Sequence, residues 1–221
     1  MTGFNPLIGL LVTAAILLPP TSLADGDTPF LATIAIERAP GSTGALDGPA
    51  MSTLHVADPA RTASSLEDID GIEVIAVSDA AVRIRAAARP TIRNSVSDLE
   101  RQSSWVIDFD EAAVQALVDK LDAASEQPAT PASLEYFVFE HIANKSYSRS
   151  FDLASRVAAS GEGDCTEHAV LLAALARAHG FPARVVFGNL ILDLDEGLFA
   201  FGHAWTEIYA DDSWEIRDAT M

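Results

Sequence analysis

The chain has 221 residues, of which 32 are Asp or Glu and 14 are Lys or Arg, so its formal net charge is −18 at pH 7. Such acidity argues against nucleic acid and anionic membrane surfaces as partners, and it favours solubility. The single cysteine excludes an internal disulfide. The length suits one large domain, or one domain with a smaller appendage.

Residues 1–24 have the features of a signal peptide. They contain no charged side chain, and the apolar run from Leu7 to Leu18 is shorter than the ~20 residues of a membrane span. Two prolines end this run, and small residues precede Asp25 at the two positions that a signal peptidase reads. We therefore expect cleavage before Asp25 and an exported protein, periplasmic or extracellular, with no stable membrane insertion after cleavage.

The next part of the chain, residues 25–103, has mostly β-strand and loop signals. The segment Phe30–Glu37 is typical of a strand, and residues 71–77 and 81–86 predict a hairpin around residues 78–80. We expect a small N-terminal region rich in strands and loops.

Residues 40–65, between these strands, are rich in Gly, Pro, Ser, Thr, Ala and Asp. They show no periodicity, so we expect an extended or mobile connection. Its histidine, His55, is expected to be solvated. Nothing in this part of the chain suggests chemistry.

Helical patterns begin at Ser104, where we place the start of a domain that runs to Met221. Three helices are predicted from their start signals: one capped by Asp108 or Asp110 and ending near Ala124, one opened by Thr130 and Pro131 and ending near Asn144, and a short one capped by Asp152 and ending near Ala159. His141 lies on the apolar face of the second helix, where a satisfied core histidine is the usual case.

The most informative stretch is GEGDCTEH, residues 161–168, in which a glycine-rich turn becomes a helix. Asp164 can cap the first amides of this helix, which we predict over residues 165–179. Its residues are apolar on almost all sides, so the helix is expected to be buried. The free N–H groups and the helix dipole favour the thiolate of Cys165, which makes it a candidate nucleophile. The alternative is that Cys165 is a small buried core residue.

Three strands are predicted after this helix: Ala183–Ile191, Leu198–Tyr209 and Trp214–Asp218. If the last two are joined by a two-residue loop, Asp211–Asp212, then Trp205 lies opposite Asp218. His203 is on the same face, two residues along. Diagonal neighbours of this kind are within reach of a hydrogen bond between an imidazole and a carboxylate.

Cys165, His203 and Asp218 thus supply the nucleophile, the base and the orienting carboxylate of covalent acyl transfer. His203 would accept the thiol proton and later protonate the leaving amine. Asp218 would hold the imidazole in the productive tautomer. The backbone N–H of Cys165 is the natural first donor to the oxyanion.

Four motifs in this order resemble the bacterial transglutaminase-like superfamily: GDCTEHA at residues 163–169, GFPARVV at 180–186, HAWTEIY at 203–209 and RDAT at 217–220. The resemblance covers roughly residues 104–221. It implies an α+β, papain-like core in which the helix that carries Cys165 packs on an antiparallel β-sheet, with Cys165, His203 and Asp218 as a catalytic triad. Family members usually continue for another strand beyond the equivalent of Asp218, so we expect the strand that carries it to fray.

The function expected from these residues is an exported, cysteine-dependent peptidase or amidase that acts on a protein or peptide substrate through a thioester, without a cofactor. Two alternatives stay open. One is a protein cross-linking transglutaminase, in which an amine resolves the same acyl-enzyme. The other is a binding scaffold of the same fold without catalysis, although the presence of all three triad residues favours an enzyme.

Metal binding is the remaining alternative. Cys165, His168 and His203 include zinc ligand types but lack the paired spacings of structural zinc sites. Residues 193–196 carry carboxylates without the full ligand set of a calcium loop. We therefore predict no metal, and we expect His168 to pack against the glycine turn.

Overall fold

The computed structural model describes residues 33–38, 40, 49–87, 92, 95–124, 126–146, 151–195 and 197–221. The predicted signal peptide and residues 30–32 of the first predicted strand lie outside these ranges. The chain divides into two compact units. The N-terminal unit comprises residues 1–92 and 188–203, and the helical unit comprises residues 93–187 and 204–221. Within the described ranges, no helix has the length and apolarity needed to cross a membrane.

The N-terminal unit contains a three-stranded antiparallel sheet in the order β2-β4-β3. Its strands are β2 (Ala50–His55), β3 (Ile72–Val77) and β4 (Ala81–Ala86), and α1 (Pro59–Glu67) packs on β3 and β4. Leu66 of α1 and Val82 and Ile84 of β4 are fully or almost fully buried in the core of this unit. The predicted hairpin of residues 71–86 is confirmed.

The prediction of an extended or mobile connection over residues 40–65 is wrong for most of residues 50–65, where β2 and most of α1 lie. Residues 41–48 lie outside the described residues. Side chains of β2 alternate between half-buried and exposed, as expected of a strand with one covered face. Asp58 caps α1 by accepting the N–H of Arg61 at 3.0 Å, and Pro59 occupies its first position. The strand β2 and the helix α1 consist largely of small and polar residues, so the composition of this stretch resembles that of a loop. His55 is exposed, as expected, although it lies on β2.

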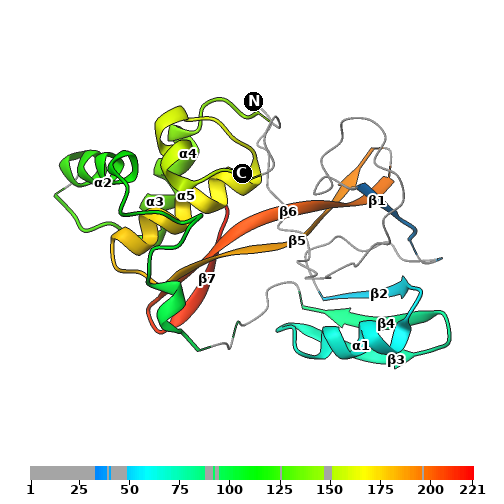
Figure 1. The fold of residues 1–221 in the computed structure, drawn as a ribbon. Coiled ribbons are helices and arrows are strands. Elements are labelled where there is room, and N and C mark those ends of the chain that lie inside the picture. Colours follow the sequence, from blue (N-terminus) through cyan, green and yellow to red (C-terminus); the bar gives the residue numbers. More distant parts are fainter. Residues whose placement is uncertain are drawn as a thin grey trace. The chain divides into compact units, whose positions relative to one another are not determined.

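The helical unit contains α2 (Ala112–Ala124), α3 (Pro131–His141), α4 (Ala154–Ser160) and α5 (Cys165–Ala178). Helix α5 contacts the other three, and it lies among them in Figure 1. Every residue of α5 from Thr166 to Arg177 is buried, which confirms the predicted buried helix. The guanidinium of Arg177 donates to the carbonyls of Ala183 and Gln102, so it fixes the chain on both sides of α5.

The structure overturns two of the predicted cap residues: Asp152 for α4, and Asp108, one of the two candidates for α2. Asp108 does not cap α2; its carboxylate accepts the N–H and the hydroxyl of Ser155, at 2.8 and 2.6 Å, in the first turn of α4. Asp152 is not the cap of α4 either, because Leu153 is the N-cap residue and makes no side-chain cap. Asp152 is predicted from the sequence because it lies just before α4. The packing of α2 against α4 instead brings Asp108, which precedes α2, to the N–H of Ser155 in the first turn of α4.

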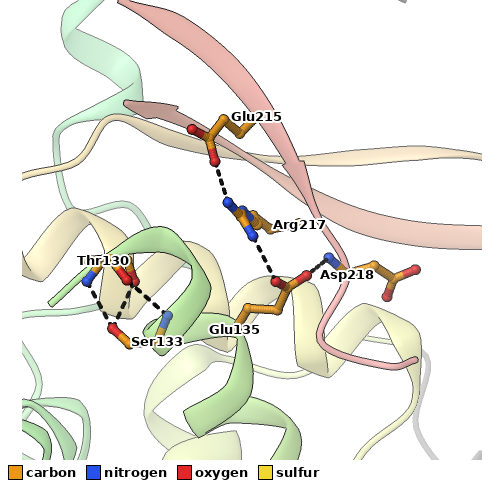
Figure 2. A network of polar contacts seen from close by, with 6 residues as sticks. All are labelled: Thr130, Ser133, Glu135, Glu215, Arg217 and Asp218. Atoms are coloured by element: carbon orange, nitrogen blue, oxygen red, sulfur yellow. Dashed lines mark hydrogen bonds and ion pairs between the residues drawn. The ribbon is translucent and has the colours of Figure 1, made fainter. Parts of the chain in front are cut away.

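Helix α3 begins as predicted, with Thr130 and Ser133 in a reciprocal capping box (Figure 2). It ends at His141 and not near Asn144, because Asn144 forms a bridge with Glu162. His141 is a satisfied core histidine, as predicted, since its Nε2 atom lies 2.9 Å from the carbonyl oxygen of Ala158.

The second sheet has β6 (Gly197–Ala210) next to β1 (Thr33–Ile36), β5 (Ala183–Leu194) and β7 (Ser213–Arg217). In the helical unit, β6 and β7 are antiparallel, and Ala210 lies opposite Ser213. The loop between them is therefore Asp211–Asp212, as predicted. Both residues have positive φ angles, 48° and 60°, which suit a tight hairpin turn.

The pairing of β6 with β7 continues to Thr206 and Arg217, so Asp218 lies one residue beyond the strand. The prediction that the last strand includes Asp218 is wrong by this residue. The larger prediction is confirmed: the fold is α+β, with Cys165 at the start of a buried helix and an antiparallel sheet.

Candidate active site

The turn before Cys165 requires its two glycines. Gly161 ends α4 in the left-handed conformation, with φ of 62°. Gly163 has φ of 158°, and a Cβ atom at this position would lie only 2.2 Å from the Cβ of Glu167. No side chain fits there, so the close approach of the chain to the first turn of α5 depends on glycine.

Asp164 is the N-cap of α5, as predicted. Its carboxylate accepts the N–H and the hydroxyl of Thr166, each at 2.9 Å. In return, Oε2 of Glu167 accepts the N–H of Asp164 at 2.9 Å, which completes a capping box. The carbonyl oxygen of Asp164 lies 2.6 Å from Nδ1 of His168. The backbone of Asp164 is therefore fixed on both sides.

Cys165 is the first residue of α5 and is half-buried, whereas Asp164 and Thr166 beside it are buried. Cys165 thus keeps part of its surface exposed at a helix N-terminus, where the dipole favours a negative charge. Burial raises the pKa of the Glu167 carboxyl, which reduces its tendency to place a second negative charge in this turn.

His168 is completely buried, and its Nδ1 contacts the carbonyl of the cap residue Asp164. Because a carbonyl oxygen only accepts, Nδ1 carries the proton, and Nε2 is an acceptor in the neutral ring. Burial lowers the pKa of His168, and nearby Lys145 acts in the same direction, whereas Asp218 acts against them. The ring is therefore held toward its neutral form.

Asp218 is fixed by contacts that the sequence did not predict. Its N–H donates to Oε1 of Glu135 in α3 at 2.7 Å, and its own Oδ1 accepts the N–H of Thr220 at 3.0 Å. Glu135 also accepts from Arg217 at 3.2 Å, and Arg217 pairs with Glu215. Figure 2 shows the side chain of Asp218 directed away from Glu135. The expected fraying of this segment is opposed by these bonds, although it lies beyond the strand.

His203 is the last residue of the segment that belongs to the N-terminal unit, whereas Cys165 and Asp218 belong to the helical unit. The next residues of β6 are tied to α5, because the hydroxyl of Thr206 donates to the carbonyl of Ala169 at 2.9 Å. The pairing of His203 with Cys165 and Asp218 stays a prediction.

Residues 115–219 match the family model of the transglutaminase-like superfamily. This region is a transglutaminase-like domain. It contains both Cys165 and Asp218, and it confirms the resemblance of the four motifs. No curated protein matches the chain significantly.

Several solved structures are similar to the chain. Two show the periplasmic domain of TgpA from Pseudomonas aeruginosa, one of them bound to ethylmercury. Both are 19% identical to this chain and cover 99% of it, with 84% and 86% of their own length and TM-scores of 0.49 and 0.47. A structure described as a TGase is 15% identical, covers 78% of this chain and 51% of its own, and has a TM-score of 0.37.

Among the described residues of the transglutaminase-like domain and the N-terminal unit, no group of three His, Cys, Asp or Glu side chains is arranged to hold a metal ion. Asp193, in the acidic stretch considered for calcium, forms an ion pair with Arg38. The residues that reasoning from sequence missed are Glu135 and Lys145, which contact the segment of Asp218 from 83 and 75 positions away. Neither carries a local sequence signal.

The buried His168 predicts a pH dependence of stability. Because its pKa is lower in the folded protein, the unfolded chain binds more protons below about pH 6.5, so this residue lowers the free energy of unfolding as pH falls. The raised pKa of Glu167 acts in the opposite direction, so the comparison requires a variant. His168→Gln should lose less stability than wild type between pH 7.5 and pH 5.5, measured by urea unfolding.

The matched control is His55→Gln, which replaces an exposed histidine on β2. If His168→Gln and wild type lose the same stability over this pH range, the buried neutral state of His168 is contradicted.

Proposed function

We propose that this protein is an exported cysteine hydrolase that cleaves amide or peptide bonds of a protein or peptide substrate through a thioester on Cys165. The observation that carries the proposal is the position of Cys165, half-exposed as the first residue of a buried, capped helix in a transglutaminase-like domain. This position combines access for a substrate with stabilisation of the thiolate.

In the first half of the proposed reaction, His203 accepts the thiol proton and the sulfur of Cys165 attacks the carbonyl carbon of the scissile amide. The N–H of Cys165 donates to the oxyanion that forms. When the tetrahedral intermediate collapses, the C–N bond breaks and the proton on His203 passes to the leaving amine. Cys165 is left as a thioester.

In the second half, His203 takes a proton from a water molecule, which attacks the carbonyl carbon of the thioester. Collapse breaks the C–S bond, releases the carboxylic acid and restores the thiol of Cys165. Asp218 holds the imidazole of His203 in the tautomer whose unprotonated nitrogen faces the thiol of Cys165. It also stabilises the charged imidazolium in both halves of the reaction. The bonds from Glu135 and Thr220 keep the main chain and carboxylate of Asp218 in place for this role.

Alkylation tests the activation of the thiol. At neutral and mildly acidic pH, iodoacetamide should modify Cys165 faster than it modifies free cysteine, and His203→Ala should lose this excess rate because the imidazolium partner is gone. The rate constant is measured across pH by intact mass, with Cys165→Ser as the unreactive control. Equal pH profiles of alkylation for wild type and His203→Ala would refute the proposed pairing of Cys165 with His203.

The fate of the acyl-enzyme tests the reaction type. A p-nitrophenyl ester of an acylated amino acid should acylate Cys165 and be turned over to the free acid, since the proposal has water resolve the thioester. Products are quantified with and without added methylamine, and Cys165→Ala should show no acylation. Amide as the main product would replace hydrolysis by transamidation. Failure of the folded protein to be acylated would favour a binding scaffold.

Export is proposed from the pattern of residues 1–24. When the gene is expressed in a bacterium, the periplasmic or secreted protein should begin at Asp25, as read by N-terminal sequencing. Replacing Leu10 and Leu11 by Arg should leave an uncleaved cytoplasmic protein, because the apolar run is interrupted. A wild-type protein that keeps residues 1–24 and stays in the cytoplasm would contradict export.

A further inference from the structure

Residues 144 and 145 connect the turn before Cys165 to the turn after Asp218. The main chain of Asn144 bonds the glycine turn in both directions, accepting from Gly163 at 3.1 Å and donating to Gly161 at 3.3 Å. Its side chain donates to Glu162 at 2.8 Å. The next residue, Lys145, donates from Nζ to the carbonyl of Thr220 at 2.8 Å.

Helix α3 holds both Lys145 and Asp218. The Nζ atom of Lys145 lies 4.8 Å from the centroid of the Phe139 ring, a cation–π distance. Phe139 is one turn along α3 from Glu135, which accepts the N–H of Asp218 at 2.7 Å. The segment from Asp218 to Thr220 is thus bound at its first residue by Glu135 and at its last by Lys145.

The charged side chains around the segment from Asp218 to Thr220 differ between its two ends. Asp218 follows Arg217, which pairs with both Glu135 and Glu215, so two further carboxylates lie on that side. Lys145 supplies a positive charge at the other end of the turn. The positive charge of Lys145 also acts on the buried His168, because it contributes to the lowered pKa of that residue.

We propose that Lys145 is a positioning residue for the active site, acting through Asp218. By joining Thr220 to Asn144, which is bonded to the glycine turn, it sets the position of the Asp218 carboxylate relative to Cys165. This inference rests on the proposed function, in which Asp218 orients His203 and thereby stabilises the thiolate.

The test uses iodoacetamide alkylation of Cys165 across pH in the full chain. Lys145→Met should lower the rate constant at pH 7 by up to about tenfold, the scale of one charge-assisted hydrogen bond. Lys145→Arg keeps a cation and should retain most of the wild-type rate. Because Lys145 is exposed, the loss of its side chain should leave the fold intact, which thermal unfolding checks.

Lys120 provides the matched control. Its Nζ lies 5.6 Å from the centroid of Phe137, so Lys120→Met also removes a lysine from a phenylalanine of α3. Lys120 lies on α2 and contacts the ring of Phe137, whereas Lys145 contacts the ring of Phe139. Lys120→Met should keep the wild-type alkylation profile.

A double-mutant cycle separates positioning from a direct effect of charge. In an Asp218→Asn background, Lys145→Met should cause no further loss, because Lys145 acts through Asp218. An equal loss in both backgrounds would overturn the inference, since the charge would then act on the thiol directly. Glu135→Gln, which weakens the other end of the same segment, should behave as Lys145→Met does.

The outcomes distinguish this inference from the proposed function. If Asp218→Asn slows alkylation and Lys145→Met does not, the inference is overturned and the triad stands. If Asp218→Asn keeps the wild-type profile, this inference and the orienting role of Asp218 are both overturned, whereas the hydrolase proposal is tested separately by the acylation of Cys165.

Discussion

The hydrogen bonding of Asp164 is the constraint on which the candidate site depends. Its N–H, its carbonyl and its carboxylate are all bound by side chains or amides of the first turn of α5. Most of the bonds that fix the residue that follows, Cys165, therefore come from its own helical turn, and Asn144 adds main-chain bonds to the two preceding glycines. Because the helix behind it is buried from Thr166 to Arg177, little freedom remains to move the thiol.

Asp218 is positioned by the opposite means. No helix or strand contains it, and its location depends on Glu135 of α3 and on the bond from Lys145 to Thr220. The nucleophile is thus held by local bonds, and the proposed orienting carboxylate by tertiary ones. Loss of packing between α3 and β7 should disturb Asp218 while leaving the start of α5 formed.

The sequence predicted the features that are encoded within a few residues. The cap at Asp164, the burial of α5 and the loop Asp211–Asp212 each follow from residues next to one another, because helix caps and tight turns are local structures. The contacts of Asp108 with Ser155 and of Glu135 with Asp218 join residues 47 and 83 positions apart. They depend on how helices pack, so no local pattern indicates them. The strand β2 was missed because its alternation is carried by small and polar side chains.

The central claim is that the folded chain stabilises the thiolate of Cys165. Because this is the only cysteine, its ionisation can be followed directly by the ultraviolet absorbance of the thiolate in native protein, with Cys165→Ser subtracted to remove tyrosine and backbone signals. At neutral pH we expect the folded protein to show thiolate absorbance that the unfolded chain lacks, because only the folded chain places the thiol at a helix N-terminus. Equal thiolate absorbance of the folded and the unfolded chain would contradict an activated nucleophile and leave Cys165 as a structural residue.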